Sequence, residues 1–369
     1  MRRVAWVLGW ALLFPGSVRA QHAPRTEMSI GSSYLRAPRV GAGANPHRGI
    51  VSVPGNLTGR SALAGDGVPL AEPIALKISS GTLYGTLELP AGKPPFPVAL
   101  IIAGSGHTDR DGNSATPQGK LNNNSNKMLA EALAARGIAS LRYDKRGVGE
   151  SAKAITKVED TRFDDLIEDA VAWGKQLRSD RRFGPLVLLG HSEGSLIGMV
   201  ASRQLAANGF VSIAGSGKPA GQIIREQLKP LPPELMKQAE EIIKGLEEGR
   251  TTENIPPSLP SSVKVLFRPS VQPYEISWFK YDPAKEIAKL KMPVLILQGS
   301  TDIQVSVEHA KLLANANPSA KLVIIEGMNH VLKEVPADPG KQLRSYSDPA
   351  LPVSPQLVNE ITGFIRPLK

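Results

Sequence analysis

The chain has 369 residues, of which 41% are hydrophobic, so it is long enough for one large α/β domain with insertions. It contains no cysteine, which excludes both a disulfide framework and a lipid-modified cysteine anchor. The formal net charge is +10, but the basic residues are spread along the chain and are not interleaved with aromatic residues. We therefore expect no nucleic-acid partner.

Residues 1–20 have the composition of a secretory signal. Arg2 and Arg3 precede an apolar run at residues 4–14, and small residues near Ala20 offer a cleavage site before Gln21. Removing this segment takes three arginines and lowers the formal charge from +10 to +7. The apolar run is short for a membrane span, so we expect an exported protein, periplasmic or extracellular, without stable membrane insertion. The alternative is an uncleaved membrane anchor.

Residues 21–70 are rich in Gly, Pro, Ala, Ser and Arg and show no sustained period, which predicts a largely disordered linker. This basic segment could touch anionic lipid or an envelope polymer. We expect the folded part to begin near Pro73. Residues 74–78 and 83–89 alternate like two antiparallel strands joined by a turn.

From Pro97 onward, short apolar strands alternate with amphipathic helices. This alternation predicts an α/β fold with a mostly parallel central sheet and helices on both faces, formed by residues 71–216 and 284–369. The predicted strands are residues 98–103, 138–143, 186–189, 210–214, 294–298 and 322–326, and the helices include 127–135 and 163–177.

One interval breaks the alternation, because about eighty residues separate the strand that ends near Ala214 from the one that starts near Val294. Residues 233–248 have an amphipathic helical pattern, whereas residues 254–273 are proline-rich and are expected to be irregular. An aromatic cluster follows at Trp278, Phe279 and Tyr281. We predict that residues 217–283 form a small helical cap over the site, inserted after the sixth strand, which would exclude water and shape the acyl pocket. Alternatively, these apolar residues only pack the insertion onto the sheet.

The segment from Gly190 to Gly194 (GHSEG) has the pattern G-x-S-x-G, and it lies between an apolar strand and a helix-like run. A serine on so tight a turn needs a left-handed backbone and neighbours without side chains two residues away on each side. The pattern therefore predicts that Ser192 is a nucleophile. The alternative is a turn that is glycine-rich by chance, and the flanking strand and helix argue against it.

A serine in such a turn is followed along the chain first by an acid and then by a histidine, each on a loop after a later strand. Of the two histidines after Ser192, His309 lies in a stretch with helical spacing, whereas His330 lies on a loop after the apolar run 322–325. We therefore predict that His330 is the general base. A surface histidine near the C-terminus is the alternative.

Asp302 lies in the loop after the apolar strand 294–297 and is the predicted acid, which would orient the imidazole. Its alternative role is that of a helix N-cap or turn residue. Glu308 and Asp338 are poorer candidates, because the first lies within a predicted helix and the second follows the histidine.

The chemistry also needs two donors for an oxyanion. We predict the backbone N–H groups of Glu193 and of Ser105 in the loop after strand 98–102, with Gly106 as the fallback for the second. A competing interpretation is a metal site made by three side chains of the same loop, His107, Asp109 and Asp111. No second ligand cluster occurs at a usable spacing, so we predict neither a metal nor another cofactor.

Three segments, residues 104–113, 143–151 and 190–194, resemble the bacterial serine esterases of the α/β-hydrolase superfamily that carry a helical cap. The resemblance implies a triad of Ser192, Asp302 and His330 and a small-molecule ester substrate with a small to medium acyl chain. In such enzymes the Asp-x-Arg-Gly-x-Gly-x-Ser segment that starts at Asp144 is a scaffolding turn. We therefore do not expect Asp144 or Arg146 to be catalytic.

Other functions remain open on the same fold. A serine aminopeptidase would need a cap carboxylate to hold the substrate's amino terminus, and the candidates are Glu240, Glu241, Glu247 and Glu248. A thioesterase or acyltransferase would use the same three residues, whereas a dehalogenase would need a carboxylate at position 192. From another class, an envelope binding module without activity is disfavoured by the complete triad. The sequence does not indicate an oligomeric state.

Overall fold

The computed structural model describes residues 69–116, 119–155 and 157–369. The predicted signal peptide and almost all of the predicted linker lie outside these residues. The first strand begins at Leu70, three residues before the expected start of the folded part at Pro73, because it pairs with its partner strand as far as Leu70 opposite Leu89. Within the described ranges, no helix combines the length and apolar character that crossing a bilayer requires.

Eight strands form one sheet in the order β1-β2-β6-β3-β7-β8-β9-β10. Their bounds are β1 Leu70–Ile78, β2 Gly81–Leu89, β3 Phe96–Ile102, β6 Ala139–Tyr143, β7 Phe183–His191, β8 Gly209–Ile213, β9 Val294–Gly299 and β10 Lys321–Ile325. A separate small hairpin consists of β4 Ser114–Thr116 and β5 Gly119–Leu121.

The sheet is mostly parallel, as the sequence predicted. β2 runs antiparallel to β1 and to β6, and every neighbouring pair from β6 across to β10 is parallel. The carboxyl ends of β3, β7, β9 and β10 therefore lie at the same edge of the sheet, where an open α/β sheet binds its ligands.

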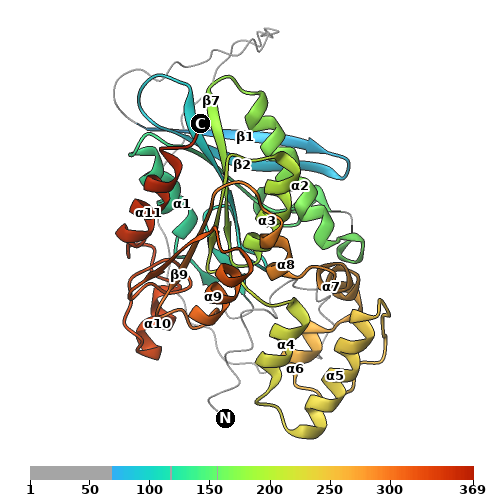
Figure 1. Ribbon diagram of the computed structural model, residues 1–369. Coiled ribbons are helices and arrows are strands. Elements are labelled where there is room, and N and C mark those ends of the chain that lie inside the picture. Colours follow the sequence, from blue (N-terminus) through green and yellow to red (C-terminus); the bar gives the residue numbers. More distant parts are fainter. Residues whose placement is uncertain (1–68, 117–118, 156) are drawn as a thin grey trace, which may run out of the picture. The chain divides into compact units, whose positions relative to one another are not determined.

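Alternation along each strand divides the core between the two faces of the sheet. In β3, the side chains of Val98, Leu100 and Ile102 belong to one buried cluster, and those of Ala99 and Ile101 belong to the other. Helices cover both faces, with α2 and α3 on one side and α1 and α11 on the other (Figure 1). Their bounds are α1 Ser125–Ala134, α2 Phe163–Ser179, α3 Glu193–Leu205 and α11 Pro355–Ile365.

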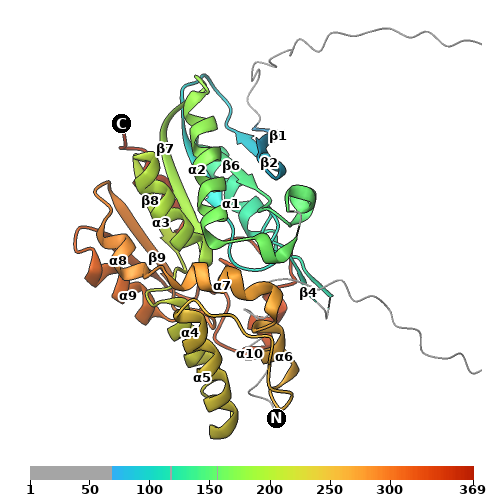
Figure 2. The same cartoon turned by 90° about the vertical axis from the view of Figure 1, so that its right-hand side faces the viewer.

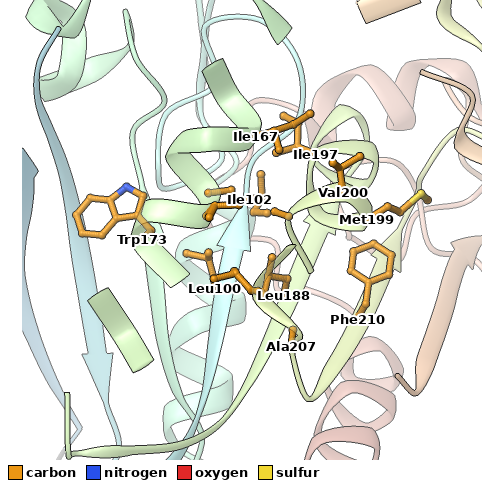
Figure 3. Packing of buried hydrophobic residues seen from close by; sticks show 14 of the residues in the cluster. Leu100, Ile102, Ile167, Trp173, Leu188, Ile197, Met199, Val200, Ala207 and Phe210 are labelled. Carbon is orange, nitrogen blue, oxygen red and sulfur yellow. The ribbon is translucent and has the colours of Figure 1, made fainter. Parts of the chain in front are cut away.

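Figure 3 shows part of the buried hydrophobic cluster that packs α2 and α3 against the sheet. Leu100 of β3 and Leu188 of β7 lie near Ile197 and Val200 of α3, and all four are buried. Fully burying one such side chain stabilises the fold by roughly 1.5–3 kcal/mol. The packing therefore fixes α3, and with it the turn between β7 and α3, against the sheet.

The insertion after β8 is helical. Its helices are α4 Ala220–Leu228, α5 Pro233–Glu247, α6 Ser261–Leu266 and α7 Gln272–Phe279, with a short 3-10 turn at η4 Pro269–Val271. Figure 2 shows α4, α5 and α6 grouped at one end of the domain, and they share a hydrophobic cluster of their own that includes Ile224, Ile243 and Leu266. We call residues 217–283 the cap.

One expectation for the cap needs correction in part. Residues 254–260 are irregular, as expected, but α6, η4 and the start of α7 occupy most of residues 261–273. Pro260 directly precedes α6, and Pro269 and Pro273 lie in the first turns of η4 and α7, where a proline starts a helix instead of breaking it.

Among the aromatic residues of α7, Phe279 packs against both the cap's own cluster and the main core, in line with the alternative that apolar residues pack the insertion onto the sheet. Tyr274 and Trp278 pack into the main core, with the Trp278 ring stacked 5.9 Å from that of Phe163 in α2.

The remaining elements connect these parts. They are η2 Gly149–Ala154, η3 Val158–Asp160, α8 Pro283–Ala288, α9 Val307–Ala316 and α10 Pro339–Ser345. η2 closes the turn after β6, and α9 connects β9 to β10. These segments hold the loops that emerge at the carboxyl edge of the sheet.

Candidate active site

Ser192 lies on a strained turn between β7 and α3. Its backbone has φ 55° and ψ −121°, a region that non-glycine residues rarely occupy. A β-carbon at Gly190 would lie 2.2 Å from the carbonyl oxygen of Gly194, and one at Gly194 would lie 2.3 Å from the carbonyl oxygen of Ile102. Both positions therefore require glycine, which accounts for the G-x-S-x-G spacing.

The loops after β9 and β10 bring Asp302 and His330 together. Oδ2 of Asp302 lies 2.9 Å from Nδ1 of His330, and the Asp302 side chain is fully buried. Its other oxygen, Oδ1, accepts hydrogen bonds from the amides of Gln304 and Val305 at 2.8 and 2.9 Å. The carboxylate is thus fixed in one orientation toward the imidazole.

Electrostatics favours an ionised Asp302. Burial alone would raise the pKa of this carboxyl, but the charge of His330 and the hydrogen bonds from His330 and the two amides outweigh it, so the pKa lies below its usual value. A carboxylate at Nδ1 keeps the proton of a neutral imidazole on that atom. Nε2 of His330 is then left to accept a proton.

A contact between two histidines places His330 beside the residue that precedes Ser192. Nε2 of His191, the residue before Ser192, donates to the carbonyl oxygen of His330 at 2.8 Å, and the two rings lie 4.9 Å apart. Burial, reinforced by the nearby charge of His330, lowers the pKa of His191 to about 3, so its ring is neutral at ordinary pH. The structure therefore brings Ser192, Asp302 and His330 to one end of the sheet.

The residues that the sequence disfavoured lie elsewhere or have other partners. His309 is in α9, and its Nδ1 accepts from the amide of Gly217 at 3.2 Å, at the start of the cap. Glu308 forms an ion pair with Lys311 of the same helix, and Asp338 caps α10. No hydrogen bond found for His309, Glu308 or Asp338 among the described residues reaches Asp302 or His330.

The loop after β3 approaches Ser192 closely. A β-carbon at Gly104 would lie 3.2 Å from Cβ of Ser192, so this loop passes directly against the nucleophile. The hydroxyl of Thr108 donates to the carbonyl oxygen of Ser105 at 2.8 Å and folds the loop back on itself. Glu193 is the first residue of α3, where backbone N–H groups have no partner within the helix. Both predicted oxyanion donors, the amides of Glu193 and Ser105, thus border Ser192, and Gly106 is one residue further along.

A buried network that sequence reasoning missed surrounds these donors. Nζ of Lys145 donates to the carbonyl oxygen of Gly104 at 2.5 Å and lies 3.4 Å from Oε2 of Glu193. The hydroxyl of Tyr274, in α7, donates to Oε1 of Glu193 at 2.8 Å. One signal was present in the sequence, because Lys145 follows a fully buried strand almost directly and lies within one of the three segments that carried the resemblance.

The residues on either side of Lys145 have the scaffolding contacts that were expected. The carboxylate of Asp144 accepts hydrogen bonds from the amides of Arg110 and Glu150 at 2.8 and 2.9 Å. Arg146 donates through Nε and Nη2 to Asp169 of α2 at 2.8 and 2.7 Å. These contacts tie the turn after β6 to its surroundings.

Two of the three side chains in the competing metal-site interpretation, Asp109 and Asp111, have other partners. Oδ1 of Asp109 accepts from the amides of Asp111 and Asn113, and Oδ1 of Asp111 accepts from Nε of Arg142 at 2.8 Å. Across the part of the chain that the structure describes, no three His, Cys, Asp or Glu side chains converge as metal ligands would. The geometry of these residues does not fit a cation.

Three hollows surround the site. The first adjoins Ser192 and has a mostly apolar wall that includes Leu196, Ile223 and Trp278. The second lies beside Glu193 and is bordered by Lys145, Tyr274 and His107. The third is a larger cavity of about 440 Å³ whose wall also includes His107 and carries further polar side chains, among them Asp109, Asn122 and Lys120. Shared wall residues thus link all three, since Glu193 borders the first two and His107 the last two.

Comparison with known proteins gives similarity to serine hydrolases. The family model described as serine aminopeptidase S33 matches residues 123–264. Esterase EstD of Thermotoga maritima is 28% identical over 259 residues, which are 69% of this chain and 59% of EstD, so the chain spans less than two thirds of that relative's length.

Solved structures with similar folds include two esterases. Est1E of Butyrivibrio proteoclasticus, determined with ferulic acid bound, has a TM-score of 0.49 and 18% identity, with 80% of this chain and 99% of that chain covered. An esterase of Pyrococcus furiosus has a TM-score of 0.49 and 15% identity, with 81% and 91% covered. The strand order and the turn at Ser192 show that this chain has the α/β-hydrolase fold.

Proposed function

We propose that this chain is a carboxylesterase-type serine hydrolase that cleaves carboxylic esters through an acyl-enzyme on Ser192. The observation that carries the proposal is the Asp302–His330 pair, at 2.9 Å, held beside a nucleophile turn whose φ is 55°. The similarity to an esterase, EstD, supports ester bonds as the substrate class.

The geometry supports the following steps. Oγ of Ser192 attacks the ester carbonyl carbon while Nε2 of His330 takes the serine proton, and Asp302 stabilises the imidazolium that forms. The amides of Glu193 and Ser105 bind the oxyanion of the tetrahedral intermediate. The C–O bond to the alcohol then breaks, and His330 gives its proton to the departing oxygen. Water, activated in turn by His330, hydrolyses the acyl-enzyme and restores Ser192.

The size of the acyl group follows from the small hollow beside Ser192. Leu196 of α3, Ile223 of α4 and Trp278 of α7 are among the residues that line it. Because these side chains are buried and packed, a long acyl chain would have to displace them. We therefore propose small to medium acyl chains.

The cavity of about 440 Å³, with its several polar side chains, supports a preference for esters of polar alcohols. It adjoins the end of the oxyanion loop, and its wall carries the hydrogen-bonding side chains of Asp109, Ser114, Asn122 and Lys120. Polar groups in a pocket select ligands that satisfy their hydrogen bonds. We propose that esters of polyhydroxylated alcohols react faster than esters of apolar alcohols with the same acyl group.

An aminopeptidase is the second candidate, and the matched family model favours it. Of the cap carboxylates that could hold an amino terminus, Glu240 and Glu247 both form ion pairs with Arg225. Glu275 of α7 is fully buried, and burial raises its pKa well above the usual value, which disfavours the charged carboxylate that an ammonium group needs as a partner. These contacts support esters over amino-terminal peptides.

The proposed location is outside the cytoplasm, periplasmic or extracellular, and it is supported by the composition of residues 1–20 alone. Expression of the full chain in a bacterial host should give a mature protein whose amino terminus is Gln21 in the exported fraction. Recovery of the uncleaved chain with the membranes would support the retained anchor instead.

The activity is tested with p-nitrophenyl esters of increasing acyl length and aminoacyl-anilides run in parallel. We expect kcat/KM to be highest for short acyl esters and far lower for the anilides. Faster hydrolysis of the anilides would overturn the esterase assignment in favour of a peptidase. Labelling by a fluorophosphonate that disappears in Ser192→Ala would separate an enzyme from an inactive binding module.

A further inference from the structure

Lys145 contacts the peptide group that carries the second proposed oxyanion donor. Its Nζ donates to the carbonyl oxygen of Gly104 at 2.5 Å, and that carbonyl belongs to the same planar peptide as the N–H of Ser105. In a trans peptide the C=O and N–H point in opposite directions. A hydrogen bond that holds the carbonyl therefore also fixes the direction of the donor.

We infer that Lys145 is a positioning residue of the oxyanion hole, a role that rests on the proposed ester hydrolysis. The ammonium group prevents the Gly104–Ser105 peptide from flipping, because a flip would separate the buried charge from its acceptor. It also polarises the peptide, and a polarised peptide is a stronger N–H donor. Lys145 acts through the backbone and not on the substrate.

The same cation reaches the residue that carries the first donor. Nζ of Lys145 lies 3.4 Å from Oε2 of Glu193, and the hydroxyl of Tyr274 donates to Oε1 of that carboxylate at 2.8 Å. Glu193 is thus held from both sides at the start of α3. Both proposed donor amides, those of Glu193 and Ser105, belong to backbone that one buried side chain restrains.

The charges of this network are balanced inside the protein. Lys145 and Glu193 are each only 4% exposed, so each charge needs the other. The neighbouring His107 does not add a charge, because burial first, and then the charges of Lys145 and Arg268, lower its pKa to about 4. Removing Lys145 alone would leave the buried carboxylate of Glu193 without its counter-ion. A variant that removes both charges is therefore needed beside the single variant.

Arg146 provides the matched comparison. It is the next residue on the same turn and is largely buried, but its ion pair joins Asp169 of α2 and not the oxyanion loop. If ion pairs of this turn served folding only, replacing either Lys145 or Arg146 would lower stability without a specific effect on the reaction. The two residues therefore separate positioning from scaffolding.

The experiment compares Lys145→Met, the double variant Lys145→Met with Glu193→Gln, and Arg146→Met in the full-length protein. The double variant removes both buried charges, so it remains interpretable if Lys145→Met alone does not fold. For each protein we would measure the melting temperature, kcat and KM for p-nitrophenyl acetate, and the inhibition constant of a trifluoromethyl ketone, whose hydrated or serine-bound form imitates the tetrahedral intermediate.

We expect the Lys145 variants to lower kcat by about 10- to 100-fold, somewhat less than the loss of a whole oxyanion donor, while KM changes little. The affinity for the trifluoromethyl ketone should fall by a similar factor, because both depend on the oxyanion donors. Arg146→Met should have a lower melting temperature than the wild type, and its kcat should stay within about threefold of the wild-type value.

A folded double variant with wild-type kcat, or one that loses kcat but binds the ketone as tightly as before, would overturn the inference. In either case the wild-type protein would still hydrolyse the ester and label at Ser192, so the proposed function would stand. Absence of hydrolysis by the wild-type protein would instead overturn the proposed function.

Discussion

The nucleophile turn and the cap are built in opposite ways. In the turn, residues 190–194, backbone atoms decide which residues fit, since a β-carbon at Gly190 or Gly194 would collide with carbonyl oxygens. In the cap, side chains decide, because α4, α5 and α6 hold together through a small apolar cluster and the ion pairs of Arg225. The position of the nucleophile therefore depends on a fixed backbone geometry. The choice of substrate depends on the packing of side chains, which substitutions can change.

This contrast has a consequence for substitutions. A change in the turn should affect every substrate by the same factor, because all of them use the same nucleophile. A change in the cap should alter the ratio between substrates and leave the reaction itself possible.

The largest effect is expected for Ser192→Ala. Without the nucleophile no acyl-enzyme can form, so kcat should fall by roughly 10⁴- to 10⁶-fold for every ester tested. Steady-state rates over the acyl series measure this. The melting temperature should be maintained, because alanine keeps the β-carbon of serine and therefore leaves the backbone strain at this position unchanged. If Ser192→Ala retained activity toward one class of ester, that ester would be hydrolysed by a second route. The expectation that a change in the turn affects all substrates equally would then be wrong.

The next effect concerns the glycines. In Gly190→Ala, a new Cβ 2.2 Å from a carbonyl oxygen must shift the turn, so we expect a loss of roughly 1–3 kcal/mol in the free energy of unfolding. We also expect about a 100-fold loss of kcat from misplacement of Ser192.

Gly363→Ala is the control for this substitution. Gly363 lies in α11, where an added Cβ meets no atom within 4 Å, so we expect a gain of about 0.5–1 kcal/mol from helix propensity and no change in kcat. Urea unfolding and ester hydrolysis measure both variants. If Gly190→Ala and Gly363→Ala had the same free energy of unfolding and the same kcat, backbone crowding at the turn would not explain the need for glycine at position 190.

A smaller and substrate-dependent effect is expected in the cap. Ile223 of α4 borders the hollow beside Ser192, whereas its neighbour Ile224 faces the cap's own cluster. Ile223→Ala should raise kcat/KM for longer acyl esters relative to acetate by about tenfold, because it enlarges the acyl side. Ile224→Ala should lose stability without changing this ratio. If both variants changed the ratio equally, the hollow would not be the acyl site.

The last prediction concerns stability alone and is a dependence of the free energy of unfolding on pH. The pKa of His191 falls from 6.5 to about 3 on folding, so between these values the unfolded chain binds a proton that the folded chain does not. The free energy of unfolding should therefore fall as the pH is lowered through this window. His191→Gln keeps a donor for the His330 carbonyl but cannot titrate, so its stability should fall less steeply. The free energy of unfolding of both proteins is measured by urea unfolding at pH 7 and pH 4. An equal loss of stability between these pH values in the wild type and in His191→Gln would contradict the prediction.

Much of the fold was predictable because it depends on local pattern. Six of the strands and the helices near residues 127–135 and 163–177 follow from apolar runs, and only their ends differ. β7, for example, begins at Phe183 instead of Leu186, because Phe183 pairs with Phe96 across the sheet. His330 was separable from His309 for a similar reason, since one follows a strand and the other has helical spacing.

What could not be predicted depends on contacts between distant residues. Lys145 meets Gly104 and Glu193, which are 41 and 48 residues away, and no spacing rule connects them. The helices α6 and α7 were missed because prolines were interpreted as breaks, although Pro260 directly precedes α6 and Pro273 lies in the first turn of α7. The sequence could show that a cap exists but not which side chains face the nucleophile.

The hydrogen bond from His191 to the carbonyl of His330 joins loops that are 139 residues apart in the sequence. It ties the histidine's own backbone to the residue before Ser192, so neither loop can drift without breaking a buried contact. The conformational entropy of bringing these two loops together is therefore lost once, when the chain folds, and adds nothing to the activation barrier of each turnover. Thermal inactivation should accordingly coincide with global unfolding instead of preceding it.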